Sequence, residues 1–246
     1  FKSIEYAVGH VTAGDTVMLK KGTYTGSSNR EVEISSYNPS INFDNFKDVV
    51  ITSEKGPDST IIDANYQGNH FVLEGDNNHG LDSTFQFIGL TFTNGLSKNE
   101  KGGGSFVIQG DGVMSNSKPK MQPKFKNCIF KNNEVRYSGG GDVSGGAFYI
   151  AAATPIFENC LFEDNRAQGT GGAIDIQQMF STTDTTWIRN TIFRNNISHN
   201  EGSSEVRSVE GGAINISQGI NLIISGSNFI NNQAIRYSDD NGQGVR

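Results

Sequence analysis

The amino-acid sequence predicts an all-β protein, folded as a right-handed parallel β-helix with a short capping helix at its N-terminal end. Three observations lead to this prediction: two motifs alternate along the chain, the apolar runs have a period of two residues, and Gly, Ser and Asn separate these runs. A repeat of about 20 to 50 residues is typical of solenoids, propellers and arrays. A propeller would need tight hairpin turns, whereas longer loops separate the strands here, so the sequence favours a solenoid.

The first dozen residues favour a helix. Ile4, Ala7, Val8 and Val11 would fall on one face of it, and Gly14-Asp15 ends the pattern. An open strand edge at the end of a solenoid would otherwise attract other chains. We therefore expect this helix to cover the first coil.

The first repeated motif centres on a phenylalanine. Successive copies are 38, 32, 31 and 36 residues apart, and they place Phe92, Phe130, Phe162, Phe193 and Phe229 at the same position. Because the coils of a β-helix lie about 4.8 Å apart, like residues stack in columns. The Phe column is therefore expected to fill the core. Lys131, Glu163 and Arg194 would form a neighbouring column of alternating charge on the outside.

An asparagine follows the phenylalanine by three residues in the last four copies. These residues are Asn133, Asn165, Asn196 and Asn232, while the earliest copy has Gly95 there and Asn94 one place sooner. Asparagine tolerates the left-handed conformation, and its amide can bond to the backbone and to a like neighbour. We expect these asparagines to make the sharp turn after the strand and to bond along their column.

The second motif is a glycine pair that opens the next strand. Its copies are Gly103-Gly104-Ser105-Phe106, Gly145-Gly146-Ala147-Phe148, Gly171-Gly172-Ala173-Ile174 and Gly211-Gly212-Ala213-Ile214. Each pair is expected to supply positive φ and a close approach of backbones. Beyond it, Tyr149, Asp175 and Asn215 would form an outward column.

These alternating motifs, FxxN and GGA followed by an aliphatic residue, resemble the repeats of the chlamydial polymorphic outer-membrane proteins over roughly residues 87–235. Phe148 and Ser105 depart from that pattern. The segments FKSIEYAVGHVTAGDTVMLKKGTYTG, GPDSTIIDA and FIGLTFTNG resemble the start of many β-helix proteins of the pectin-lyase-like superfamily. The first resemblance implies an exported surface protein, often an adhesin. The second implies the fold, and leaves open a polysaccharide lyase, a pectin esterase or a non-enzymatic surface protein.

One β-helix domain is expected over residues 1–246, with the cap and lead-in coils in 1–86 and the FxxN/GGA repeats in 87–246. Phe1 looks like a cut end, which suggests a piece of a longer protein. The net charge of −6, with no basic run, argues against nucleic-acid binding. No apolar stretch approaches the roughly 18 residues of a membrane span. Cys128 and Cys160 fall on adjacent coils, where parallel side chains favour free thiols over a disulfide.

Candidate ligand residues are few, and no catalytic residue is predicted. The loop DNNHGLD brings together Asp76, His79 and Asp82, which could bind a metal or a substrate; the alternative is a solvated loop. Asp63 is expected to cap a strand end. Three further aspartates could bind calcium but are expected to be structural: Asp142, Asp175 and Asp184. The other histidines are expected at the surface: His10, His70 and His199.

The function expected from these patterns is that of a secreted or cell-surface β-helix, adhesive or structural rather than catalytic, whose partner is an extracellular protein or a carbohydrate. The insertions RYSGGGDVS and SHNEGSSEVRSVE would project from one side and contact that partner. One alternative is a polysaccharide lyase or a carbohydrate-binding solenoid with a groove of charged and aromatic side chains. Another is a filament subunit that self-associates through its open strand edges. No cofactor other than calcium is expected.

Overall fold

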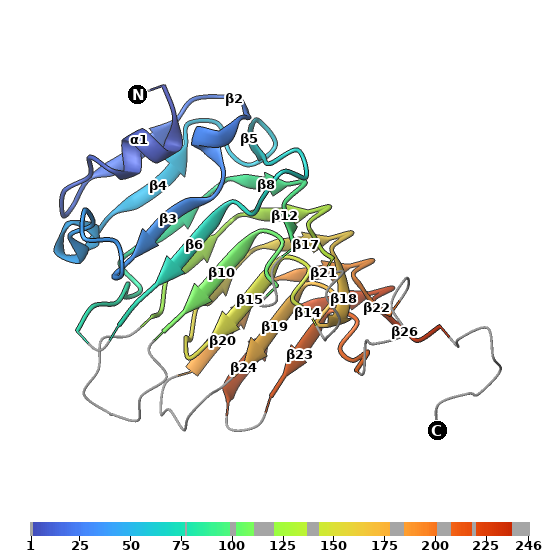
Figure 1. Ribbon diagram of the computed structural model, residues 1–246. Helices are drawn as coiled ribbons and strands as arrows, with labels where there is room; N and C mark the ends of the chain where they lie inside the picture. Colours follow the sequence, from blue (N-terminus) through green and yellow to red (C-terminus); the bar gives the residue numbers. More distant parts are fainter. Residues whose placement is uncertain are drawn as a thin grey trace.

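The computed structural model describes residues 2–76, 78–98, 102–110, 121–136, 143–177, 185–200, 208–217 and 220–237. Every strand pair among them is parallel, and successive coils stack in sequence order from α1 toward β26 (Figure 1). The predicted parallel β-helix is therefore confirmed. A full coil runs through four sheets, named here A, B, D and C in the order in which the chain meets them.

The sheets contain the following strands. Sheet A has β1 (Thr16–Leu19), β4 (Val50–Ser53), β7 (Gln86–Ile88), β11 (Lys124–Lys126), β16 (Ile156–Glu158), β20 (Thr185–Arg189) and β24 (Asn221–Ser225). Sheet B has β2 (Gly22–Tyr24), β5 (Thr60–Asp63), β8 (Thr91–Thr93), β12 (Ile129–Lys131), β17 (Leu161–Glu163), β21 (Ile192–Arg194) and β25 (Asn228–Ile230). Sheet D has β9 (Leu96–Ser97), β13 (Glu134–Val135), β18 (Arg166–Thr170), β22 (Ile197–His199) and β26 (Gln233–Ile235), with β14 (Val143–Ser144) paired to β18. Sheet C has β3 (Val32–Ser35), β6 (Phe71–Glu74), β10 (Phe106–Gln109), β15 (Phe148–Ala151), β19 (Ile174–Gln177) and β23 (Ile214–Ile216).

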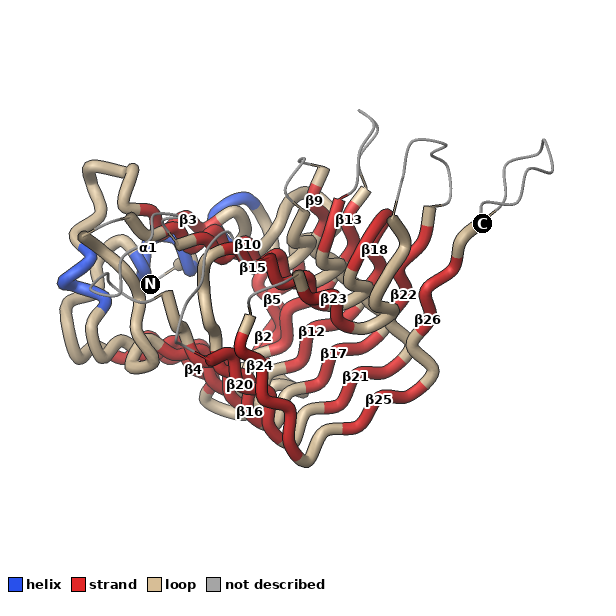
Figure 2. The backbone as a smooth tube through the Cα atoms, turned by 90° about the horizontal axis from the view of Figure 1, so that it is seen from below, coloured by secondary structure: helices blue, strands red, loops and turns tan. Residues whose placement is uncertain are grey.

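Sheets A and C lie on opposite sides of the core, and sheet D lies beyond sheet B (Figure 2). The core contains three columns of phenylalanine rings rather than one. The buried members are Phe92, Phe130, Phe162 and Phe193 on sheet B, Phe87, Phe125 and Phe157 on sheet A, and Phe71, Phe106 and Phe148 on sheet C. Rings stack within a column, as Phe106 does on Phe148 at 4.9 Å and 2°. Rings of different columns meet edge to face, as Phe106 and Phe125 do at 5.1 Å and 81°, and this geometry suits the aromatic quadrupole.

The asparagines that follow the phenylalanines form a buried ladder. Asn133 Nδ2 donates to Asn165 Oδ1 at 3.0 Å, Asn165 Nδ2 donates to Asn196 Oδ1 at 2.9 Å, and the ladder continues to Asn232. Each Oδ1 also accepts from the backbone N–H of the equivalent residue one coil earlier, as Asn165 Oδ1 does from Asn133 N at 3.1 Å. The ladder therefore satisfies polar groups that are buried between the sheets.

The prediction that these four asparagines adopt the left-handed conformation is wrong by one residue. Positive φ occurs at the preceding position, in Asn132, Asp164, Asn195 and Asn231. Asn94 takes the same conformation in the earliest copy, where Gly95 replaces the ladder residue and its N–H donates to Asn133 Oδ1. The turn and the ladder are thus separate tasks of adjacent residues. A left-handed residue bends the chain, and the next residue points its amide into the stack.

The two glycines of the second motif also have separate tasks. The first has positive φ, with 71° at Gly145 and 64° at Gly171. The second allows neighbouring coils to touch, because a Cβ on Gly146 would lie 2.1 Å from the carbonyl oxygen of Gly172. A side chain at this position would therefore push two coils apart.

The N-terminal cap is helix α1 (Ile4–Val8), which begins at Ser3 and buries Ile4, Ala7 and Val8. Asn29 Oδ1, in the 3-10 helix η1 (Ser27–Asn29), accepts from Ile4 N at 2.9 Å and fixes the start of α1. A second 3-10 helix, η2 (Phe43–Phe46), packs Phe46 against Phe85. The predicted capping helix is therefore present, and none of the described helices is long and apolar enough to cross a bilayer.

Two expectations about histidine are wrong. His70 is fully buried and His199 is 5% exposed, although both were expected at the surface; His10 is exposed. Isolation in the sequence is a poor guide to burial when coils bring distant residues together. The cysteines Cys128 and Cys160 are free and buried, and burial raises the pKa of the Cys128 thiol to about 12.

Candidate functional site on the outer face of sheet D

In the loop predicted as a ligand site, both carboxylates accept hydrogen bonds from groups of the loop itself. Asp76 Oδ1 accepts from the backbone of Asn78 and His79 and lies 3.0 Å from His79 Nδ1. Asp82 Oδ1 accepts from the backbone and the hydroxyl of Thr84, at 2.8 and 2.6 Å. In the part of the chain that the structure describes, no three His, Cys, Asp or Glu residues gather as metal ligands. A metal at this loop stays a prediction.

Of the other candidate aspartates, the structure places Asp63 in a turn and buries Asp175. Asp63 Oδ1 accepts from Asn65 N at 2.8 Å and from Asn94 Nδ2 at 3.0 Å, as a turn residue does. Asp142 and Asp184 lie outside the described residues.

Asp175 lies in register between Tyr149 and Asn215, as the outward column requires, yet its exposure is 0%. Its Oδ1 accepts from Thr170 Oγ1 at 2.9 Å and from Asn215 Nδ2 at 2.7 Å. Burial raises the pKa of this carboxyl, because the charged form loses hydration. The expectation that it sits on an open outward face is wrong. The buried carboxyl instead joins sheets D and C.

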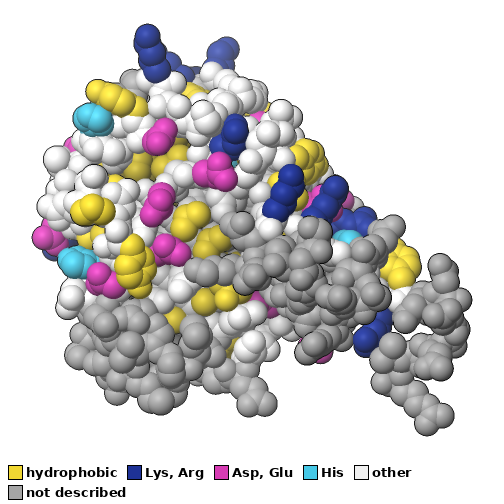
Figure 3. Space-filling model, viewed as in Figure 1, with side chains coloured by type: hydrophobic (Ala, Val, Ile, Leu, Met, Phe, Trp, Pro, Cys, Tyr) yellow, Lys and Arg dark blue, Asp and Glu magenta, His cyan; other side chains and the backbone are white. Residues whose placement is uncertain are grey.

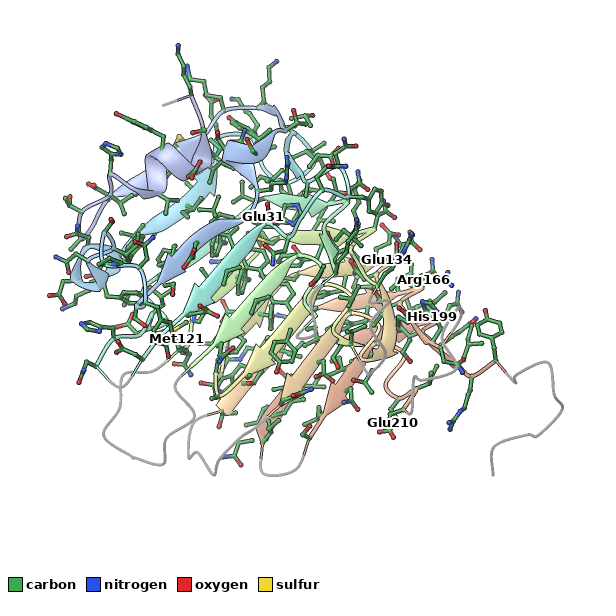
Figure 4. All side chains as sticks on the ribbon, in the orientation of Figure 1. Glu31, Met121, Glu134, Arg166, His199 and Glu210 are labelled. Atoms are coloured by element: carbon green, nitrogen blue, oxygen red, sulfur yellow. The ribbon has the colours of Figure 1, made fainter. Side chains whose placement is uncertain are left out.

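The described residues form a polar concavity on the outer face of sheet D. It has a volume of about 380 Å³, and its lining consists of Glu134, Arg136, Arg166, Gln168 and His199. Alternation along β13, β18 and β22 produces this lining, since Val135, Ala167 and Ser198 point inward and their neighbours point outward. Parallel register then brings Glu134 beside Arg166, and Gln168 beside His199. Glu134, Arg166 and His199 follow one another along the same side of the molecule (Figure 4).

Two polar pairs hold the side chains of this concavity. Arg136 donates to both carboxylate oxygens of Glu134, from Nε at 2.5 Å and from Nη2 at 2.6 Å, and this hydrogen bonding raises the pKa of its guanidinium. Arg166 Nε donates to His199 Nε2 at 2.8 Å, which places the imidazole proton on Nδ1. The face thus presents two guanidinium groups, one of them paired with the Glu134 carboxylate, together with an imidazole and an amide. Groups of this kind bind carboxylates and hydroxyls.

A smaller concavity of about 130 Å³ lies nearer the N-terminus and includes residues of the same sheet. Leu96, Ser97 and Lys98 line it on one side, with Glu31 and the segment 67–69 on the other. Leu96 is in register with Glu134, so the two concavities lie on neighbouring coils. In Figure 3, several Lys and Arg side chains lie at the right-hand margin of the face, whereas acidic side chains lie nearer its middle. The sequence patterns missed this surface, because its residues share a face only after the coils stack.

Comparison with known proteins identifies one repeat and one distant structure. Residues 159–177 match the Chlamydia polymorphic membrane protein repeat, and they span β17, β18 and β19. No curated protein matches the chain. A crystal structure of a pectin methylesterase mutant in complex with a hexasaccharide has 15% sequence identity and a TM-score of 0.32, with 97% of this chain and 63% of the enzyme covered. The chain thus spans less than two thirds of that enzyme's length. The repeat match suggests a surface-associated β-helix protein.

Proposed function

We propose that this chain is an adhesive module of a secreted or cell-surface protein, and that it binds its partner along the outer face of sheet D rather than catalysing a reaction. The observation that carries this proposal is the polar concavity on sheet D, which is lined by two guanidinium groups and one carboxylate, with an imidazole and an amide beside them. The repeated residues face inward or make turns, so partner recognition falls to the outward residues that differ from coil to coil.

The position of the insertions supports the same face. In the sequence, segment 137–142 lies between β13 and β14, and segment 201–207 lies between β22 and β23, so both follow a strand of sheet D within one or two residues. Their own structure lies outside the described residues. The residues that directly precede the two segments are Arg136, which is exposed, and Asn200, which is half-buried and follows His199. A partner that contacts both insertions would therefore also meet Arg136.

The charge of the concavity favours a partner that presents carboxylates. This chemistry suits an acidic extracellular protein, and it equally suits a uronate polymer, which is the second candidate. The specific observation in favour of the polymer is that polar groups recur on successive coils, from Lys98 through Arg136 to Gln168 and His199. A linear chain lying across the coils would meet a donor about every 4.8 Å.

The test compares two charge reversals of equal size. Arg136→Glu with Arg166→Glu changes the concavity, whereas Lys20→Glu with Lys55→Glu changes exposed residues of the first two coils, between sheets A and B. Binding is measured to immobilised extracellular-matrix proteins and, separately, to polygalacturonate. We expect the first variant to lose at least about tenfold in affinity, and the control to stay within about twofold, since reversing a contacting charge adds repulsion.

Two outcomes would contradict the proposal. Equal losses in both variants would show that net charge alone drives binding. Release of unsaturated products from polygalacturonate, followed by ultraviolet absorbance, would show a lyase instead of an adhesive module. Unchanged thermal melting of both variants is the control for folding.

A further inference from the structure

The smaller concavity, of about 130 Å³, spans three successive coils. Glu31 comes from the first coil, residues 67–69 come from the second, and Leu96, Ser97 and Lys98 come from the third. Figure 4 shows Glu31 on the N-terminal side of Glu134, which belongs to the larger polar concavity. The two concavities therefore have different linings and can bind different ligands.

Backbone hydrogen bonds hold the segment 67–69 between its two neighbouring coils. Glu31 N donates to Asn69 O at 2.8 Å, and Leu96 N donates to Gly68 O at 2.9 Å. These bonds occupy the backbone groups that a peptide strand would need in order to pair at this place. Recognition of a ligand here therefore falls to the side chains.

The carboxylate of Glu31 lies over Gly68. A Cβ on Gly68 would be 2.6 Å from Glu31 Cδ and 2.8 Å from Glu31 Oε1, so glycine leaves the room that this carboxylate occupies. The carboxylate has no hydrogen-bond or ion-pair partner among the described residues. Glu31 also has a φ of 52°, which is rare for residues other than Gly, Asn and Asp. Strained backbone of this kind is concentrated at binding sites.

Asn69 provides a second group without a partner. Its side chain is only 7% exposed, and its Oδ1 accepts no hydrogen bond from any described residue. A buried amide oxygen that lacks a donor lowers stability, and a bound molecule that donates to it removes this penalty. The concavity is thus lined by two acceptors that have no donor in the chain.

The charges around the concavity restrict the class of ligand. Exposed Lys98 repels a metal cation, and Glu31 repels an anion such as a uronate. The carboxylate requires donors, the ammonium group requires acceptors, and the amides of Gln67 and Asn69 require both. Hydroxyl groups donate and accept at once, so they satisfy all of these groups. The volume has room for about four water molecules, which suits one edge of a sugar ring.

An exposed aromatic ring lies next to these polar groups. Tyr66 directly precedes Gln67 in the chain, has a φ of 54° and is 42% exposed. Burial raises the pKa of Tyr66, and the Glu134 carboxylate raises it further, which indicates that the ring lies toward the outer face of sheet D. Leu96 of the concavity is in register with Glu134 on that face. The apolar face of a sugar ring packs well on an aromatic side chain of this kind.

We propose that the smaller concavity binds one neutral sugar residue of a glycan. Glu31 and Asn69 accept hydrogen bonds from its hydroxyls, Lys98 donates to one of them, and the apolar face of the ring packs on Tyr66. This site goes beyond the proposed function, because its ligand is neutral and its residues differ from those that bind a carboxylate partner.

The experiment measures binding of the full chain to three immobilised neutral polysaccharides, which are mannan, galactan and xylan. Glu31→Gln removes the charge, whereas Gly68→Ala keeps the charge but pushes the carboxylate out of its place. Glu33→Gln, at an exposed carboxylate on β3, is the matched control. We expect the first two variants to weaken binding at least about fivefold, and the control to stay within about twofold.

Nuclear magnetic resonance gives a second reading of the same site. A soluble tetrasaccharide of the polysaccharide that binds should shift the signals of the Asn69 side-chain amide, which a purely structural asparagine would not show. Unchanged thermal melting of Glu31→Gln and Gly68→Ala is the control for folding.

Three results would overturn the proposal. They are the absence of binding to all three polysaccharides, binding that Glu31→Gln and Gly68→Ala leave unchanged, and binding of polygalacturonate that Glu31→Gln weakens, since the last would show an acidic ligand. Arg136→Glu with Arg166→Glu should leave the binding of neutral glycan within about twofold. Failure of this site and failure of the proposed function are therefore separate results.

Discussion

His70, just before β6, occupies a position that holds Ser or Ala in the later coils. It is in register with Ser105, Ala147, Ala173 and Ala213, as the pairing of the following residues shows. Its imidazole bonds to Ser105 Oγ at 3.0 Å and lies 3.1 Å from the carbonyl oxygens of Ile62 and Thr93. The ladder asparagine is missing from the neighbouring coil, where Gly95 stands. The larger imidazole thus bonds to buried carbonyls in the region where the ladder stops.

The burial of His70 predicts a dependence of stability on pH. Burial lowers the pKa of His70 to about 4, from an ordinary value of 6.5. Below pH 6.5 this histidine is protonated in the unfolded chain but stays neutral in the folded chain. The free energy of unfolding should therefore fall between pH 6.5 and about 4 and then level off. The expected loss is roughly 3 kcal/mol. Urea unfolding across this range measures it.

His10 provides the control for this titration, because it is exposed on the capping helix side of the chain. His10→Ala should keep the same pH profile, whereas His70→Ser should flatten it and lower stability at neutral pH. A profile that stays steep in His70→Ser would assign the titration to another group.

Asn165 is the central member of the asparagine ladder. Asn165→Ala removes the acceptor of Asn133 N and Nδ2 and the donor to Phe130 O and Asn196 Oδ1. Because the remaining partners stay buried without bonds, we expect a loss of about 2 to 4 kcal/mol in the free energy of unfolding. Asn228→Ala, an exposed change on the last coil, should cost less than about 0.5 kcal/mol. Equal losses would mean that the ladder carries no special stability.

At the scale of the element, strands β8, β12, β17, β21 and β25 of sheet B are short because a residue of positive φ stands on both sides of each. Asn127 and Asn132 enclose β12, Asn159 and Asp164 enclose β17, and Asn190 and Asn195 enclose β21. Two bends of this kind turn the chain from sheet A into sheet B and from sheet B into sheet D. The recurrence of NCIF, NCLF and NTIF thus has a conformational cause in its first residue and a packing cause in its last.

The close approach of the coils at the glycine pair predicts that two Gly→Ala substitutions lower the free energy of unfolding by very different amounts. Gly172→Ala places a Cβ 2.1 Å from the backbone of the next coil, so we expect a loss of at least about 3 kcal/mol or failure to fold. Gly14→Ala, where φ is 84° and no atom lies within 4 Å, should cost only about 1 kcal/mol through backbone strain. Urea midpoints of both variants, with circular dichroism for folding, make the comparison. Similar losses would contradict the role of close approach between coils.

At the scale of the whole molecule, the net charge is −6, whereas two guanidinium groups and only one carboxylate line the concavity on sheet D. An acidic partner is therefore attracted locally and repelled globally. We expect binding to polygalacturonate or to an acidic matrix protein to weaken at least about tenfold between 50 and 500 mM NaCl, since salt screens exposed charges.

Surface plasmon resonance at several salt concentrations measures this change in affinity. Binding to the acidic partner that is insensitive to salt would contradict the assignment to Arg136 and Arg166.

The sequence alone determined the fold class, the capping helix, the inward Phe column and the glycine pairs, because each depends on a local period or on backbone freedom that repeats along the chain. Even there, it placed the left-handed turn on Asn133 rather than Asn132, since adjacent residues of one motif share a pattern while performing different tasks. Only the tertiary structure decided what depends on stacking: the second and third Phe columns, the burial of His70 and Asp175, and the polar concavity on sheet D. The physical reason is that residues more than 30 positions apart in the sequence, such as Glu134 and Arg166, become neighbours only when one coil lies on the next in register.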